Sequence, residues 1–143
     1  MSLSEASVII STADHTRLRR IASAGMRIRR APPSAHWLEA ELNRAKVVSP
    51  ANLPENVISM HSVFDFQDGI TDQVRRVTLV YPGEEDQGIR RISVLSPLGS
   101  ALIGLAEGQS MQWRGATGKR WTLRVIRVIG HPEAHQKEVS AQP

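Results

Sequence analysis

The apolar residues near the start of the chain change from a continuous run to a helical spacing. Residues 8–10 are three consecutive β-branched residues, which is typical of a short strand. Ser11 or Thr12 can then cap a helix, and Asp14 falls in its first turn, where a negative charge suits the helix dipole. Apolar or small residues follow every three or four positions, at Leu18, Ile21, Ala24 or Gly25, and Ile28. This pattern predicts a helix that is stopped by Ala31-Pro32-Pro33, because proline lacks the N–H that a helix requires.

A second helix is predicted after these prolines. Ser34 is its candidate cap, and Leu38, Leu42 and Ala45 recur at positions i, i+4 and i+7. The pair Ser49-Pro50 marks its end. Two helices of about 14 residues, each roughly 20 Å long, would form a short antiparallel hairpin, a coiled coil.

From residue 57 onward the apolar positions alternate with a period of two, which is typical of strands. The candidate strands are residues 57–60, 62–66, 74–81, 91–95, 109–114 and 121–129. One segment departs from this alternation, with Ser96 as a cap, Pro97 at the first helical position, and Leu98, Leu102 and Ile103 as core positions of a short helix. The expected fold class is α+β, in which the helical hairpin precedes an antiparallel sheet of about five strands with one helix across a face.

These patterns divide the chain into four parts. Residues 1–48 hold the N-terminal segment and the helical hairpin, and residues 49–56, with two prolines, are a linker. Residues 57–130 form the sheet domain, and residues 131–143 are a polar tail. The oligomeric state stays open, although the strand at residues 8–10 would offer an exposed edge to another chain.

Composition and charge narrow the range of functions. The chain has 143 residues, 41% of them hydrophobic, and no cysteine, which excludes disulfides, thiolate metal sites and a cysteine nucleophile. No apolar run is long enough for a membrane span, and the first residues do not resemble a secretory signal, so we expect a cytoplasmic protein. Residues 14–46 carry eight basic and three acidic side chains, a net charge of +5, whereas the rest of the chain carries −1. The hairpin should therefore attract an acidic surface or phosphates.

The sequence offers little for catalysis or for binding a metal or cofactor. His131 and His135 have a metal-like spacing, but Pro132 lies between them in a polar tail. Glycines 99, 104 and 108 are not followed by the Lys and Ser/Thr of a phosphate-binding loop, which favours turn and packing roles. The acidic residues 84–86 are interpreted as a solvated turn. We therefore expect no catalytic residue, no metal and no cofactor.

Two stretches of the chain resemble a known family. The sequence SPLGSALIGLAEG at residues 96–108, followed by Gln109, resembles the C-terminal signature of the GreA/GreB transcript-cleavage factors, whose fold is FKBP-like. Residues 37–66 and the sequence RRVTLVYP at residues 75–82 resemble the Rnk branch of that family, in which the N-terminal hairpin is unusually short. The resemblance covers residues 8–129 and agrees with the expected order of hairpin and sheet.

The resemblance implies a transcription regulator that binds RNA polymerase. Gre factors dock their C-terminal domain beside the secondary channel of the polymerase and insert a long coiled coil whose acidic tip holds a catalytic magnesium. Arms of roughly 20 Å are too short to reach deep into a channel. The sequence also has no Asp or Glu from Arg17 to Ala35, and a divalent ion needs carboxylate oxygens. Both features argue against cleavage chemistry, and the resemblance to the Rnk branch implies a non-enzymatic protein that competes with Gre factors without stimulating transcript cleavage.

The same resemblance suggests two contact surfaces. The candidate polymerase-docking residues are Ser96, Pro97, Gly99 and Ala101, because the family docks through this domain. The candidate contact residues of the hairpin are Arg20, Arg27, Arg29 and Arg30, which would face acidic protein or nucleic-acid phosphates within the polymerase complex.

Two alternatives remain. The basic hairpin could bind nucleic acid directly, with an affinity that falls steeply as salt is added. An FKBP-like domain could also be a peptidyl-prolyl isomerase, which needs aromatic side chains around an apolar cleft. The aromatic residues of the C-terminal region are Phe64, Phe66, Tyr81, Trp113 and Trp121, and strand alternation sends several of them into the core, which disfavours this activity.

Overall fold

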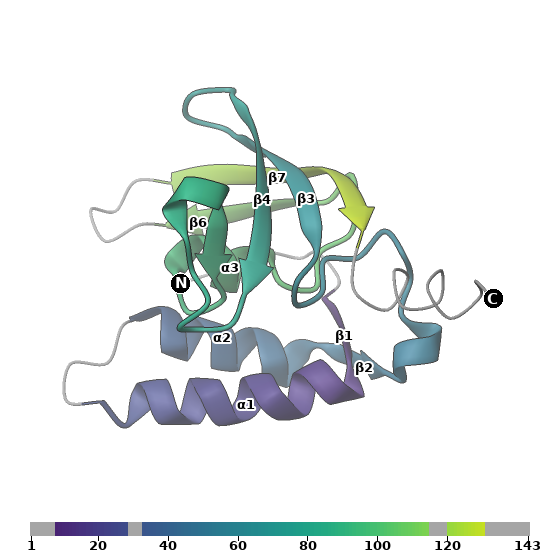
Figure 1. The fold of residues 1–143 in the computed structure, drawn as a ribbon, viewed down its shortest axis with the longest axis vertical. Helices are drawn as coiled ribbons and strands as arrows, with labels where there is room; N and C mark the ends of the chain where they lie inside the picture. Colours follow the sequence, from purple (N-terminus) through teal and green to yellow (C-terminus); the bar gives the residue numbers. More distant parts are fainter. Residues whose placement is uncertain (1–7, 29–32, 115–119, 131–143) are drawn as a thin grey trace.

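Two adjacent helices lie along one end of the molecule, and a twisted sheet rises above them (Figure 1). The computed structural model describes residues 8–28, 33–114 and 120–130. The helices are α1 (Thr12–Met26), α2 (Pro33–Arg44) and α3 (Pro97–Leu102), with single 3-10 turns η1 (Pro50–Asn52) and η2 (Gln87–Ile89). The strands are β1 (Ile9–Ser11), β2 (Lys46–Val48), β3 (Val63–Asp68), β4 (Val74–Val80), β5 (Arg91–Ser93), β6 (Ser110–Arg114) and β7 (Arg120–Gly130). The α+β class expected from the sequence is confirmed.

Helix α1 begins after the predicted cap Ser11 and ends at Met26, before the prolines that were expected to stop it. The Ser11 side chain accepts a hydrogen bond from the Asp14 N–H at 3.2 Å, which satisfies one of the unpaired donors of the first turn. The buried face includes Leu18 and Gly25. Ile28, expected on this face, is 57% exposed, because the helix has already ended at Met26.

Helix α2 packs closely on α1. A Cβ atom at Gly25 of α1 would lie 3.1 Å from the Cβ of Ala35, so glycine allows the two helices to approach each other. Ser34, the predicted cap, instead lies inside α2, is buried, and donates a hydrogen bond to the carbonyl of Leu95. None of the helices among the described residues is long and apolar enough to cross a membrane.

The predicted end of α2 at Ser49 is wrong, because the chain becomes extended after Arg44. Residues 46–48 form β2, which pairs in parallel with β1. The Ile9 N–H also donates to the carbonyl of Gly104 at 3.0 Å, and Val8 is buried. The strand at the start of the chain is therefore paired within its own chain, which corrects the expected exposed edge.

The larger sheet has five strands in the order β5-β4-β3-β7-β6. Its pairs are antiparallel except for β4 with β5, which run parallel, so the fully antiparallel sheet expected from the sequence is wrong at this edge. Residues 57–60, expected as a strand, form only one isolated bridge, from Val57 to Ala106. Their backbone bonds to the segment after α3 instead, as in the 2.8 Å bond from the Ile58 N–H to the Leu105 carbonyl.

The helices and the sheet share one hydrophobic core. Its members come from the strand segment β1, both long helices, the sheet and the α3 region, and include Val8, Ile10, Leu18, Ala22, Leu38, Leu42, Ile58, Phe64, Phe66, Val77, Leu79, Leu102, Ile103, Met111, Leu123 and Val125. Residues 49–56, expected as a linker, contain η1 and the buried Leu53. The two long helices are thus packed on the sheet rather than extended from it.

Helix α3 is held against β5 by a close backbone contact. Ser96 caps it by accepting from the Gly99 N–H at 3.0 Å, and Pro97 occupies its first position, as predicted. A Cβ atom at Gly99 would lie 2.1 Å from the backbone carbonyl oxygen of Ser93, a distance that no side chain can occupy. Only glycine fits here without movement of the backbone.

A polar junction fixes the first turn of α1 to the sheet domain. Asp14 accepts hydrogen bonds from the Met60 N–H at 3.2 Å and from the Tyr81 hydroxyl at 3.4 Å. Burial raises the pKa of the Asp14 carboxyl, and the bonds from Met60 and Tyr81 offset part of this effect. The same burial raises the pKa of Tyr81.

The junction predicts a specific pH dependence of stability. Asp14 has its ordinary pKa of 3.8 in the unfolded chain and a raised one in the folded protein, so the folded state holds this proton to higher pH. Relative to the variant Asp14→Asn, the free energy of unfolding of the unmodified protein should fall as pH rises through the raised pKa and be constant above it. Denaturant unfolding of both proteins from pH 4 to pH 8 measures this difference. A difference that is flat or that rises with pH contradicts the assignment.

The contact at Gly99 predicts a loss of stability on substitution. Gly99→Ala should lower the free energy of unfolding by about 1–3 kcal/mol, because β5 and α3 must separate to admit the methyl group. Gly130→Ala is the matched control, since a Cβ there meets nothing within 4 Å. Thermal and denaturant unfolding give both values. Equal stability of the two variants would show that the contact is not a constraint.

Candidate functional site

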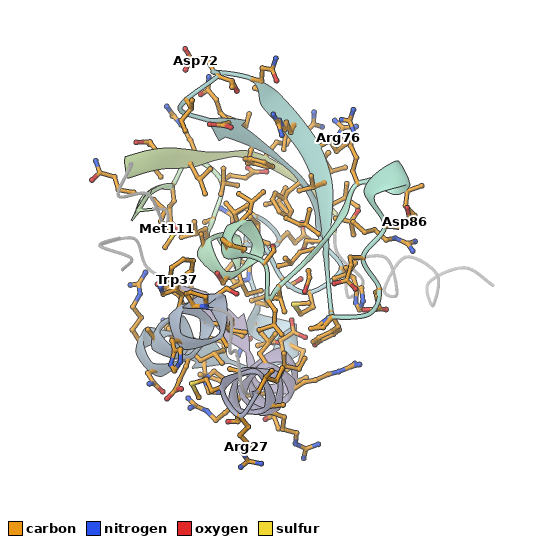
Figure 2. The ribbon with its side chains drawn as sticks, turned by 90° about the vertical axis from the view of Figure 1, so that its left-hand side faces the viewer. Arg27, Trp37, Asp72, Arg76, Asp86 and Met111 are labelled. Carbon is orange, nitrogen blue, oxygen red and sulfur yellow. The ribbon has the colours of Figure 1, made fainter. Side chains whose placement is uncertain are left out.

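The exposed side of α1 carries a group of basic side chains. Arg19, Arg20 and Arg27 line an open hollow of about 520 Å³ together with His15, Thr16, Ser23 and Ala24. These positions are three or four residues apart, so they share the side of the helix that faces away from Leu18 and Gly25. Figure 2 shows Arg27 pointing away from the body of the protein. We call this surface the α1 basic face.

Some of these side chains are held by α2 and others are not. His15 Nε2 lies 3.0 Å from the Leu42 carbonyl, and Arg19 Nη2 donates to Asn43 Oδ1 at 2.9 Å. Arg20 and Arg27 are exposed, and their side chains make no hydrogen bond or ion pair with the part of the chain that the structure describes. Both were predicted as contact residues. Arg29 and Arg30, predicted with them, lie outside the described residues.

Two of the three acidic residues of α1 and α2 are placed away from this face or are already paired, and the third, Glu39 of α2, is half-buried. Asp14, the acidic residue of α1, lies in the first turn, in the junction with the sheet domain. Glu41 of α2 is buried and pairs with Arg44 at 2.9 Å. Within the described ranges, no group of three or more His, Cys, Asp or Glu could hold a metal ion.

A second set of charged contacts lies beside the N-terminal part of α1, around Tyr81. The Arg17 guanidinium lies over the Tyr81 ring, 3.9 Å from its centroid. The ring of His61 meets the same tyrosine edge-on, and its Nε2 lies 3.0 Å from Glu84 Oε1. This hydrogen bond, with one from the Tyr81 N–H, lowers the pKa of Glu84. Sequence reasoning missed the cluster, because its members are far apart in the chain.

The predicted docking residues in and before α3 are divided between surface and core. Pro97 is exposed and Ser96 is half-buried. Gly99 and Ala101 are buried, the first by its contact with Ser93 and the second in the core. Leu102 and Ile103 lie in the core as expected, and Leu98 packs against it. The surface that this segment offers is therefore centred on Pro97.

The aromatic residues are arranged as a core rather than around an open cleft. Phe64 and Phe66 are fully or almost fully buried, with their ring centroids 6.3 Å apart, and Tyr81 is 5% exposed. The side chains of Trp113 and Trp121 lie outside the described residues. The residues that are described give no aromatic cleft for a proline ring. The acidic residues 84–86 are exposed in the connection between β4 and η2, after a turn at residues 82–83, and Asp86 forms an isolated bridge with Arg91.

Comparison with known proteins finds a family match in each half of the chain. Residues 53–129 match the family described as "Transcription elongation factor, GreA/GreB, C-term", and residues 7–48 match "Rnk N-terminus". The chain is 35% identical over 136 residues to the protein called "Regulator of nucleoside diphosphate kinase" from Escherichia coli (strain K12). That alignment covers 92% of this chain and 96% of the relative.

Two further relatives carry the Gre name. GreA from Thermodesulfovibrio yellowstonii is 31% identical over 91 residues, which span 64% of this chain and 57% of that protein. The solved structure of a "Prokaryotic transcription elongation factor GreA/GreB from Nitrosomonas europaea" superposes with a TM-score of 0.66 at 35% identity, covering 85% of this chain and 97% of the other. The chain belongs to the GreA/GreB transcription elongation factor family and resembles its Rnk members along almost its whole length.

Proposed function

We propose that this protein is a non-enzymatic transcription regulator that binds RNA polymerase near its secondary channel and competes with Gre factors without stimulating transcript cleavage. The observation that carries the proposal is the α1 basic face. Cleavage factors of this family hold a magnesium ion on acidic residues at the tip of a long coiled coil, whereas this face presents Arg20, in the middle of α1, and Arg27, just after its last residue. Its acidic residue, Asp14, is bound in the junction at the opposite end of the helix.

Charge and length both oppose cleavage chemistry. Magnesium is bound through carboxylate and water oxygens, and nearby arginines repel a cation. Helix α1 has 15 residues, so it is about 22 Å long at 1.5 Å per residue. Its inner side is packed into the core through Leu18. A helix of this length, lying on the sheet domain, supports a role at the rim of a channel rather than deep inside it.

The C-terminal domain supplies the proposed docking surface around Pro97. Gly99 and Ala101 support this surface from inside, because their contacts hold α3 against β5 and the core. The hydrogen bond from Ser34 to the Leu95 carbonyl joins α2 to the segment that leads into α3. A partner bound at Pro97 would therefore meet the two long helices in a fixed orientation, with the α1 basic face available for a second contact.

A second candidate function is direct binding of nucleic acid by the α1 basic face. The observation that favours it is the hollow lined by three arginines, which could accept a phosphate. This candidate requires affinity for RNA or DNA in the absence of polymerase. It also requires a steep loss of that affinity as salt is added.

The proposal predicts the outcome of a competition experiment. Added to core RNA polymerase with GreA and a stalled transcript, the protein should inhibit cleavage and should produce none when GreA is omitted. Arg20→Glu combined with Arg27→Glu should weaken inhibition at least tenfold, corresponding to about 1.4 kcal/mol, because acidic surface would then face acidic surface. Quantified RNA products over a concentration series give the inhibition constants.

The matched control reverses the charge of two exposed arginines of β7. Arg124→Glu combined with Arg127→Glu changes the net charge equally but on the sheet, and it should inhibit as the unmodified protein does. Cleavage by the protein alone, or equal loss of inhibition in both double variants, would refute the role given to α1. Tight, salt-sensitive binding to free RNA without any effect on the polymerase would favour the second candidate.

A further inference from the structure

The outer edge of β4 is covered along only part of its length. On one side β3 pairs with β4 from Thr78 to Val74. On the other side β5 pairs only with residues 78–80, because it is three residues long. Among the described residues, no strand lies beside residues 74–77 on that side. In Figure 1 the hairpin that joins β3 and β4 projects above the rest of the sheet, at the top of the view.

The backbone of this open edge presents both donors and acceptors. The Thr78 N–H donates to the Arg90 carbonyl beside β5, whereas the Leu79 N–H donates to the Ser62 carbonyl on the β3 side. Because backbone groups alternate along a strand, Val74 and Arg76 direct their N–H and C=O groups to the same side as Thr78. A row of such unpaired groups is a template for a further strand.

Two hollows border the edge. One, of about 610 Å³, is lined by residues 73–75, 77 and 90–92. The other, of about 330 Å³, is lined by residues 76–78, 88–90 and Val63. Val77 and Arg90 line both hollows. Gln73 and Arg75 line only the first, whereas Arg76 and Thr78 line only the second. Because alternate residues of a strand point to opposite faces, the two hollows lie mainly toward opposite faces of the sheet. Side chains of an added strand alternate between the faces and would enter the two hollows in turn.

The chemistry of the edge is basic and apolar. Arg75, Arg90 and Arg91 are exposed and have no ion pair within the described part of the chain, whereas Arg76 is held by Asp65 at 2.9 Å. Val74 is 55% exposed and Ile89 is 56% exposed. A second copy of this edge would bring like charges together, which disfavours pairing between two copies. A partner strand with carboxylates and apolar side chains matches both features.

We propose that the open edge of β4 at residues 74–77, with Arg75, Arg90 and Arg91, binds an extended acidic and apolar peptide segment of a partner protein. The segment adds to the sheet as a strand beside β4, on the side that β5 leaves open. Its backbone bonds to Val74 and Arg76, and its carboxylates meet the three arginines. This is the strand-addition mode of peptide recognition, in which the backbone supplies affinity and the flanking hollows supply selectivity.

The test uses a short fluorescent peptide in which valine alternates with glutamate. Binding is followed by fluorescence anisotropy, and the site is mapped by amide chemical shifts of the labelled protein. Saturable binding is expected, with shifts concentrated at residues 74–77 and 90–92. The same peptide with lysine in place of glutamate should not bind.

Two variants separate strand addition from simple charge attraction. Val74→Pro removes one N–H of the open edge without touching the bonds to β3, and it should lower the affinity at least tenfold relative to Val74→Ala. Arg75→Glu combined with Arg91→Glu should lower it by a similar factor. Thermal unfolding checks that each variant is folded, and the Arg20→Glu/Arg27→Glu variant, altered on α1, should bind the peptide normally.

The proposal fails if the glutamate peptide shows no saturable binding or if the shifts map to another surface. It also fails if Val74→Pro binds the peptide as tightly as Val74→Ala while the Arg75→Glu/Arg91→Glu variant loses binding. The attraction would then be electrostatic only, without strand addition. Dimerisation of the protein through this edge, seen by analytical ultracentrifugation, would likewise overturn it. None of these outcomes bears on competition with GreA, which is measured separately.

Discussion

The shared core of the two long helices and the sheet fixes the position of every surface discussed above. Leu18 and Leu42 are buried in the same cluster as Phe64 and Leu79, so α1 and α2 cannot move without exposing core residues of the sheet. Removing one such leucine typically costs 2–5 kcal/mol, a large part of the stability of a small domain. The α1 basic face is therefore displayed on a rigid support, and its orientation is set by apolar packing rather than by its own charges.

Polar contacts then attach the first turn of α1 to the sheet domain. The first turn is bound to the sheet domain through Asp14, and Arg17 covers Tyr81 beside it. Beyond this turn, Arg19 and Arg20 are exposed in the middle of the helix, and Arg27 is exposed just after its last residue. The one acidic side chain of α1 is thus used for structure, which leaves the outer surface of the helix with a single sign of charge. Such a surface steers an acidic partner toward it over roughly one Debye length.

Local signals in the sequence predicted the elements that local interactions determine. Ser11 and Ser96 cap α1 and α3 as expected, since a cap depends on atoms only three residues away. The errors lie where distant segments decide. Strand β2 forms because residues 46–48 meet β1, and β5 runs parallel to β4 because residues 81–90 first carry the chain back along β4. The close contact of Gly99 with the Ser93 backbone could not be predicted either, because helical periodicity does not identify the segment that packs against a glycine. Of the candidate site, the exposure of Arg20 and Arg27 follows from helical periodicity, whereas the cluster around Tyr81 required the fold.

The fold gathers basic side chains that are dispersed along the sequence. Outside residues 14–46 the net charge is −1, a total that gives no sign of a second basic surface. The structure instead gathers Arg75, Arg90 and Arg91 around one hollow, because a parallel neighbour brings residues 90–92 beside β4. Figure 2 shows Arg27 and Arg76 at opposite ends of the molecule. Two basic surfaces separated in this way can be occupied at the same time, so an acidic peptide on the sheet edge need not displace a partner from α1. A protein of this size could therefore connect two acidic partners through one rigid core.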